Sequence, residues 1–157
     1  MGLSQEMQKM VEVLKEYDGR LRKDNSTYKH YFAPEVPEKV MKKLISNFDS
    51  HLSINGVVGY YDTTLFGTTK AGVLFTNDGF YYKYIGKAIY FAYKDIDGMR
   101  VENRKLYMSV VNGDMSEYTI IDVLDMAVLK TIVEELMQID DTYGQSSFKS
   151  VSYTHLR

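Results

Sequence analysis

The stretch of this chain whose residue types could do chemistry is residues 60–72, YYDTTLFGTTKAG. It holds a carboxylate at Asp62 and an ammonium at Lys70, together with hydroxyls at Thr63, Thr68 and Thr69. These groups could cradle a phosphate, bind a lipid headgroup, or simply form a turn between two strands. We therefore take these five residues as candidates for a loop that binds a ligand or a partner.

The spacing in this stretch argues against a nucleotide site. A phosphate loop needs lysine directly after a glycine, with a helix following to present its N-terminus. Here Lys70 comes three residues after Gly67, and an apolar run of strand type follows. Tight capture of a multiply charged headgroup needs more than one cation, and Lys70 is the only one in this stretch. A weak anionic-lipid or headgroup binder centred on Lys70 remains an alternative.

A second candidate is the run Asp49-Ser50-His51, which joins an acid, a hydroxyl and an imidazole. The members of a catalytic triad meet through folding and not as sequence neighbours, so this run carries little weight. The end of a helix and solvation explain it better. A small hydrolase using Asp49, His51 or Asp62 with Lys70 remains an alternative, which requires these side chains to meet in a cleft.

The composition of the chain argues against several classes of function. The 157 residues are 45% apolar and 25% charged with a net charge of -2, so no bulk positive field would draw nucleic acid. There is no cysteine, which excludes disulfides, thiolate metal sites and cysteine nucleophiles. The histidines, His30, His51 and His155, follow no metal-ligand spacing. We expect no cofactor, no secretory signal and no integral membrane segment, and hence a cytoplasmic protein.

Two helices should open the chain, and a third should close its folded part. Apolar residues recur at steps of three and four from Ser4, a reasonable N-cap, to Arg22. Pro37 suits the first turn of a second helix that ends near residues 50–55. Asp122 or Asp125 can cap the last helix, which carries an apolar stripe to Ile139.

Between the second and third helices the apolar period changes to two, which is typical of strands. Seven short strands are predicted at residues 56–61, 71–76, 80–85, 88–93, 99–102, 105–111 and 117–121. Short turns such as Asn77-Asp78-Gly79 separate them, which indicates an antiparallel sandwich or barrel. In the run Tyr81-Tyr82-Lys83-Tyr84 we expect one face in the core and the other partly exposed. The acidic balance argues against an aromatic surface for nucleic acid there.

The segment DTTLFGTTKAGVLFTNDGFYYK, followed by IYFAYKDI, resembles a bacterial pleckstrin-homology-like family of small, mostly uncharacterised cytoplasmic proteins. The matching positions are Asp62, Thr63, Leu65, Phe66, Gly67, Lys70, Gly72, Thr76, Gly79, Tyr81, Tyr82, Tyr93 and Ile96. The resemblance implies an α+β fold with a seven-stranded antiparallel barrel or sandwich, capped by a C-terminal helix and preceded by two N-terminal helices. It also implies a binding or scaffolding module. It gives no known reaction that could be assigned to this chain, since fold does not imply function.

Three segments follow from these patterns: residues 1–55 as an N-terminal helical segment, 56–140 as the barrel with its helix, and 141–157 as a disordered tail. The final VSYTHLR resembles a tail produced by read-through, so residues 151–157 are left out of the fold prediction. We predict a non-enzymatic module that binds a protein partner or a second copy, through sheet edges or the N-terminal helices. The methionines at positions 7, 10 and 41 suit either an adaptable partner surface or the core.

Overall fold

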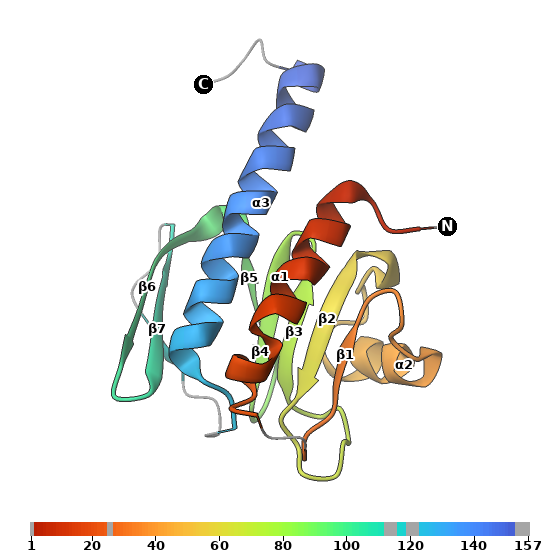
Figure 1. Ribbon diagram of the computed structural model, residues 1–157, viewed down its shortest axis with the longest axis vertical. Coiled ribbons are helices and arrows are strands. Elements are labelled where there is room, and N and C mark those ends of the chain that lie inside the picture. The colour runs from red at the N-terminus through yellow and green to blue at the C-terminus, as the bar shows by residue number, and fades with distance from the viewer. Residues whose placement is uncertain (1, 25–26, 112–115, 119–122, 153–157) are drawn as a thin grey trace.

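The computed structural model describes residues 2–24, 27–111, 116–118 and 123–152. It is an α+β structure with three helices and two antiparallel sheets (Figure 1). The helices are α1 (Gln5–Leu21), α2 (Glu38–Asn47) and α3 (Met126–Ser152), with short 3₁₀ turns η1 (Ile54–Gly56) and η2 (Tyr93–Asp95). The strands are β1 (His30–Phe32), β2 (Val57–Asp62), β3 (Gly72–Thr76), β4 (Gly79–Lys83), β5 (Ile89–Ala92), β6 (Ile96–Glu102), β7 (Lys105–Val110) and β8 (Ser116–Tyr118).

The helix starts follow the capping residues that the sequence offers. The Ser4 hydroxyl accepts a hydrogen bond from the Met7 amide at 3.2 Å, which satisfies one free donor of the first turn of α1. Asp125 does the same for α3, where its carboxylate accepts from the amides of Ala127 and Val128 at 3.0 and 3.1 Å. Of the two predicted caps for this helix, Asp122 lies outside the described residues.

Strand order confirms an antiparallel architecture. The first sheet has the order β1-β2-β3-β4-β5, and the second has the order β6-β7-β8. Each of the seven predicted strands is represented, although residues 119–121 of the last one lie outside the described residues. An eighth strand, β1, was not predicted, and it pairs with β2 through His30–Tyr61 and Phe32–Gly59. Within the described residues no strand pairing joins the two sheets, so the predicted closed barrel is not seen there.

The five-stranded sheet forms a middle layer. Helices α1 and α3 run side by side over one of its faces, and α2 lies on the other (Figure 1). Phe80 and Tyr82 therefore enter the larger core with α1 and α3. Tyr81 enters a smaller core with Leu44 of α2 and the C-cap residue Phe48. The prediction that one face of this strand is partly exposed was wrong for Tyr81, which is buried because α2 folds back over the sheet.

The C-terminal segment also differs from expectation. Helix α3 continues to Ser152, whereas the sequence predicted irregular chain after residue 141. No proline interrupts residues 126–152, and a helix that is already packed can be extended one hydrogen bond per residue. The segment boundaries at residues 55 and 140 stay predictions.

Candidate functional site

The predicted loop of Asp62, Thr63, Thr68, Thr69 and Lys70 connects β2 to β3, and the Asp62 carboxylate organises it from within. Asp62 is only 2% exposed. Its Oδ1 accepts from the amide of Thr64 at 2.8 Å, and its Oδ2 accepts from the amide of Thr69 at 2.9 Å. These bonds occupy the carboxylate with the backbone of its own loop. The structure therefore gives Asp62 the role of a loop organiser.

Of the other four predicted loop residues, two are buried and two are exposed. Thr63 and Thr69 are buried, and the Thr69 carbonyl accepts a 2.9 Å hydrogen bond from the side-chain amide of Asn47 on α2. Thr68 and Lys70 are exposed. The loop is thus fastened both to its own carboxylate and to the end of α2.

The outer end of this loop carries an apolar pair that the sequence reasoning did not single out as a site. Phe66 is 86% exposed and Leu65 is 59% exposed, and we call these two residues the loop tip. Lys43 of α2 and Lys70 border the same shallow depression as Phe66. The Lys29 side chain passes beside Gly67, where an added methyl group would lie 3.2 Å from Lys29 Cγ. The Phe66 ring, which shares a depression with Lys43 and Lys70, is the most exposed apolar feature of this loop.

The acid, hydroxyl and imidazole at positions 49–51 come close without forming a catalytic relay. Nδ1 of His51 lies 3.4 Å from the Ser50 hydroxyl and 3.9 Å from the Asp49 carboxylate, so both partners face one ring nitrogen. A relay needs them on opposite nitrogens. The His51 side chain is 92% exposed. A 2.7 Å hydrogen bond from the Tyr81 hydroxyl, followed by one from the His51 amide, lowers the pKa of Asp49.

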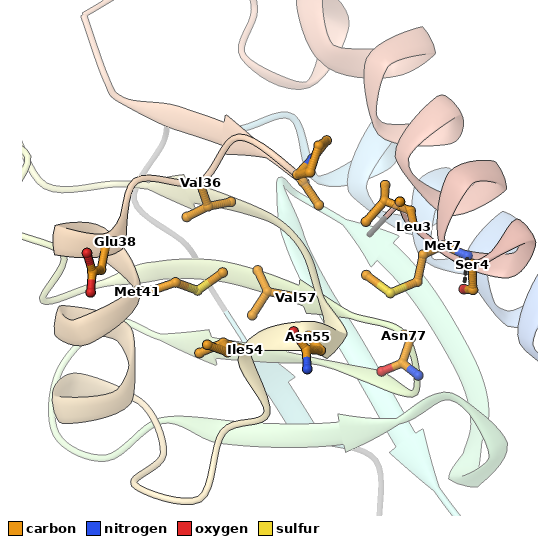
Figure 2. Close-up of a pocket in the computed structure, with 13 residues that line it drawn as sticks. Leu3, Ser4, Met7, Val36, Glu38, Met41, Ile54, Asn55, Val57 and Asn77 are labelled. Carbon is orange, nitrogen blue, oxygen red and sulfur yellow. Dashed lines mark hydrogen bonds between the residues drawn. The ribbon is translucent and has the colours of Figure 1, made fainter.

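A larger hollow than the depression beside Phe66 lies between the start of α1 and the start of α2 (Figure 2). It is an open groove of about 840 Å³. We call it the groove, and its lining residues are Gly2, Leu3, Ser4, Met7, Ala33, Pro34, Val36, Glu38, Met41, Ile54, Asn55, Val57 and Asn77. The lining comes from segments far apart in the sequence, which is why no local motif could have predicted it.

The groove is mainly apolar. Figure 2 shows Leu3 and Met7 on the α1 side and Met41 on the α2 side, with Val57 between them. Ile54 of η1 is 49% exposed and forms part of the lining. Of the methionines that the sequence offered for a partner surface, Met7 and Met41 line the groove, whereas Met10 is fully buried in the core.

Polar groups of the groove are few, and the Ser4 hydroxyl among them is already used as the α1 cap. Throughout the described part of the chain, every buried side-chain nitrogen or oxygen has a hydrogen-bond partner. Asn55, Asn77 and Glu38 complete the polar lining. This composition suits the binding of apolar side chains, with a few polar groups to orient them.

Three acidic side chains interact near the start of α1. Glu6 lies between the lining residues Ser4 and Met7, and Asp78 follows the lining residue Asn77. Burial, and then the charges of Asp140 and Asp78, raise the pKa of Glu6. Burial, followed by the charges of Asp78 and Asp141, raises the pKa of Asp140, while Lys94 opposes this. We call Glu6, Asp78 and Asp140 the acidic cluster.

Comparisons of the chain with protein-family models, curated proteins and solved structures found no match. Within the residues that the structure describes, no helix combines the length and apolar character needed to cross a membrane.

Proposed function

We propose that this chain is a non-enzymatic binding module, and that its groove receives apolar side chains of a protein partner. The observation that carries the proposal is the groove itself, which is open, apolar and formed partly by two methionines. The thioether side chain of methionine is flexible and polarizable, so it adapts to partners of different shape. Full burial of one aliphatic or aromatic side chain contributes about 1.5–3 kcal/mol, so a few such residues give useful affinity.

The order of elements supports a pleckstrin-homology-like architecture for this module. Strands β2 to β5 pair consecutively, strands β6 to β8 form a second sheet, and α3 follows them. Helices α1 and α2 are additions to that plan, and together with the segment 33–36 between β1 and α2 they supply much of the groove lining. The proposed binding site therefore lies where the additions meet the sheet. The lack of cysteine is consistent with work in the reducing cytoplasm.

A photo-crosslinking experiment tests this proposal. Ile54 is replaced by p-benzoylphenylalanine, which places the reactive ketone in the groove on a side chain that is already half exposed. The control carries the same group at Ile85, which is 79% exposed and lies outside the groove lining. We expect irradiation to give a protein adduct from position 54 that position 85 does not give. Equal adducts from both positions, or none from position 54, would contradict a binding role for the groove.

A further inference from the structure

Two turns at the same end of the five-stranded sheet expose large apolar side chains. Asp62 of β2 pairs with Gly72 of β3, and Gly72 pairs with Lys83 of β4, so the loop tip and the turn after β4 lie at one end of their strands. Tyr84 and Ile85 in that turn are 44% and 79% exposed, and we call them the hairpin tip. The two tips together supply four of the eight large apolar side chains that are exposed in the described part of the chain, so apolar exposure is concentrated at this end.

Asn47, the last residue of α2, fastens both turns to one framework. Its side-chain amide donates to the Thr69 carbonyl at 2.9 Å, and its own carbonyl accepts from Nζ of Lys83 at 2.8 Å. From within the loop, the Asp62 carboxylate accepts from the amides of Thr64 and Thr69. Because this framework is in place before docking, the exposed side chains that it carries lose little entropy when they bind a surface.

Lysines flank both tips. Lys43 of α2 and Lys70 border the same depression as Phe66, and Lys87 follows the hairpin tip by two residues. Among the residues that the structure describes, none of these three lysines has a salt-bridge partner. The sequence offered a single cation in the loop, and folding adds Lys43 from a separate helix. The apolar tips are therefore accompanied by uncompensated positive charge.

Charge is distributed unevenly between the two ends of the sheet. Residues 63–71 and 84–88 contain no acid, and Asp62 at the base of the loop is only 2% exposed. Asp78 of the acidic cluster follows the other end of β3, and Glu6 lies at the start of α1, which Figure 1 shows at the end of the sheet opposite the loop between β2 and β3. A negatively charged surface therefore attracts the end with the tips and repels the end with the acidic cluster.

We propose that the two tips dock on an anionic membrane surface, with Phe66 and Ile85 inserted among the headgroups and the lysines facing the lipid charges. These are the two most exposed large apolar side chains described, at 86% and 79%. A fluid bilayer surface accepts protruding side chains wherever they fall, whereas a protein partner needs a packed, complementary surface for each. Insertion of apolar side chains and attraction of lysines to anionic lipids add together in such binding.

This docking surface is separate from the groove, and the proposal does not rest on the binding role of the groove. Asn77 of the groove lining follows the end of β3 that lies away from the tips. Ser4 of the lining caps the start of α1, which lies at that same far end in Figure 1. A chain docked through its tips therefore leaves the groove open to a partner.

Vesicle flotation tests the proposal. We expect the wild type to float with vesicles of phosphatidylcholine and phosphatidylserine but not with phosphatidylcholine alone, and added salt should release it. Phe66→Ser should weaken binding about tenfold, as for loss of one partly inserted aromatic side chain. Lys70→Ala should weaken it about fivefold, as for one lysine near an anionic surface. The controls Val111→Ser and Lys9→Ala change exposed residues outside both tips and should bind like the wild type.

Insertion can be measured directly, because the chain has no tryptophan of its own. Phe66→Trp and Ile85→Trp each introduce a single fluorescent reporter at a tip. Their emission should shift to shorter wavelength when phosphatidylserine vesicles are added, whereas that of Val111→Trp should not. All five substituted positions are exposed, so the fold should survive, and circular dichroism of each variant verifies this.

Three results would overturn the membrane proposal. The first is a wild-type chain that does not float with the phosphatidylserine vesicles, and the second is equal flotation of the wild type and Phe66→Ser. The third is tryptophan emission from positions 66 and 85 that the vesicles leave unchanged. If p-benzoylphenylalanine at position 66 crosslinks to a protein while the chain fails to float, the tips belong to a protein interface instead.

Discussion

Oδ2 of Asp62 accepts a hydrogen bond from the backbone amide of Thr69 at 2.9 Å, which closes the loop between β2 and β3 across seven residues. The same carboxylate accepts from the Thr64 amide at 2.8 Å. One buried acid thereby fixes both halves of the loop that presents Phe66. Asp62 and Thr69, which first suggested a ligand site, hold the loop in shape. The exposed side chains of Leu65 and Phe66 lie between them in the sequence.

Replacing this carboxylate should loosen the loop. The change Asp62→Ala leaves the buried amide of Thr69 without its acceptor, and such a loss costs about 1–3 kcal/mol of unfolding free energy. Urea denaturation followed by circular dichroism measures this cost. The control Asp97→Ala changes an exposed acid and should stay within about 0.5 kcal/mol of the wild type. Equal stability of the two variants would show that the Asp62 bonds are not needed.

Gly72, where β3 begins, should tolerate no side chain. Its φ is +138°, and an added methyl group would lie 2.1 Å from the Tyr61 carbonyl oxygen on the neighbouring strand. Backbone atoms paired in a sheet cannot move aside easily, so Gly72→Ala should cost more than the 1–3 kcal/mol of a strained backbone alone. Gly86 is the matched control, with φ +81° but open space around it. We expect the urea midpoint to be highest for the wild type, lower for Gly86→Ala and lowest for Gly72→Ala. A lower midpoint for Gly86→Ala than for Gly72→Ala would contradict the close approach of Gly72 to the Tyr61 carbonyl.

Tyr61 ties the sheet to α1, and removing its hydroxyl should weaken that contact. The hydroxyl donates to Oδ1 of Asp18 at 2.8 Å, and Arg22 also donates to this carboxylate. Burial opposes ionisation of Asp18, but the hydrogen bonds from Arg22 and Tyr61 lower its pKa overall. A hydrogen bond to a charged group contributes about 1.5–3 kcal/mol, so Tyr61→Phe should lower the unfolding free energy by that amount. Tyr84→Phe, at an exposed position, should leave it unchanged.

The acidic cluster should make stability depend on pH in a defined direction. Burial and the charge of Asp78 raise the pKa of Asp140, so the folded state holds this proton more tightly than the unfolded chain does. Ionised Asp140 therefore costs stability at neutral pH, and the cost disappears below the ordinary aspartate value of 3.8. We expect Asp140→Asn to raise Tm by about 1–2 °C at neutral pH and to leave it unchanged in acid.

Asp49 provides a control of opposite sign for that experiment. The hydrogen bond from Tyr81 lowers its pKa, so ionised Asp49 stabilises the folded state above pH 3.8, and this contribution is lost as the pH falls. Asp49→Asn should therefore lower Tm at neutral pH and lose its effect in acid. Thermal unfolding curves at several pH values separate the two cases. Shifts of the same sign for both variants would contradict the assigned charges.

Much of the fold could be predicted because its signals are local. Ser4 caps α1 as expected, and the turn at residues 77–79 joins β3 to β4. The strand β1 was missed because it has only three residues and follows a polar break. The burial of Tyr81 was missed for another reason, since alternation along a strand does not reveal that a distant helix covers its second face.

The candidate site was predictable only in part. The residue types at positions 62–70 pointed to the right loop, but burial of Asp62 and exposure of Phe66 depend on how the loop folds. The groove draws on residues between positions 2 and 77, and no spacing rule connects them. Of its lining, Met7 and Met41 had been marked in advance by the adaptability of methionine.

The most direct test of the groove as a binding site uses the methyl groups of methionine as reporters. Met7 and Met41 line the groove, whereas Met10 and Met108 are buried in the core, at 0% and 1% exposure. Methyl NMR spectra of the wild-type chain are recorded as N-acetylphenylalanine amide, a mimic of one apolar side chain of a partner, is added. The resonances of Met7 and Met41 should shift, those of Met10 and Met108 should stay in place, and Ile54→Asp in the groove lining should abolish the shifts. Unchanged groove resonances in the wild type, or equal shifts of the core methyl groups, would contradict the proposed binding site.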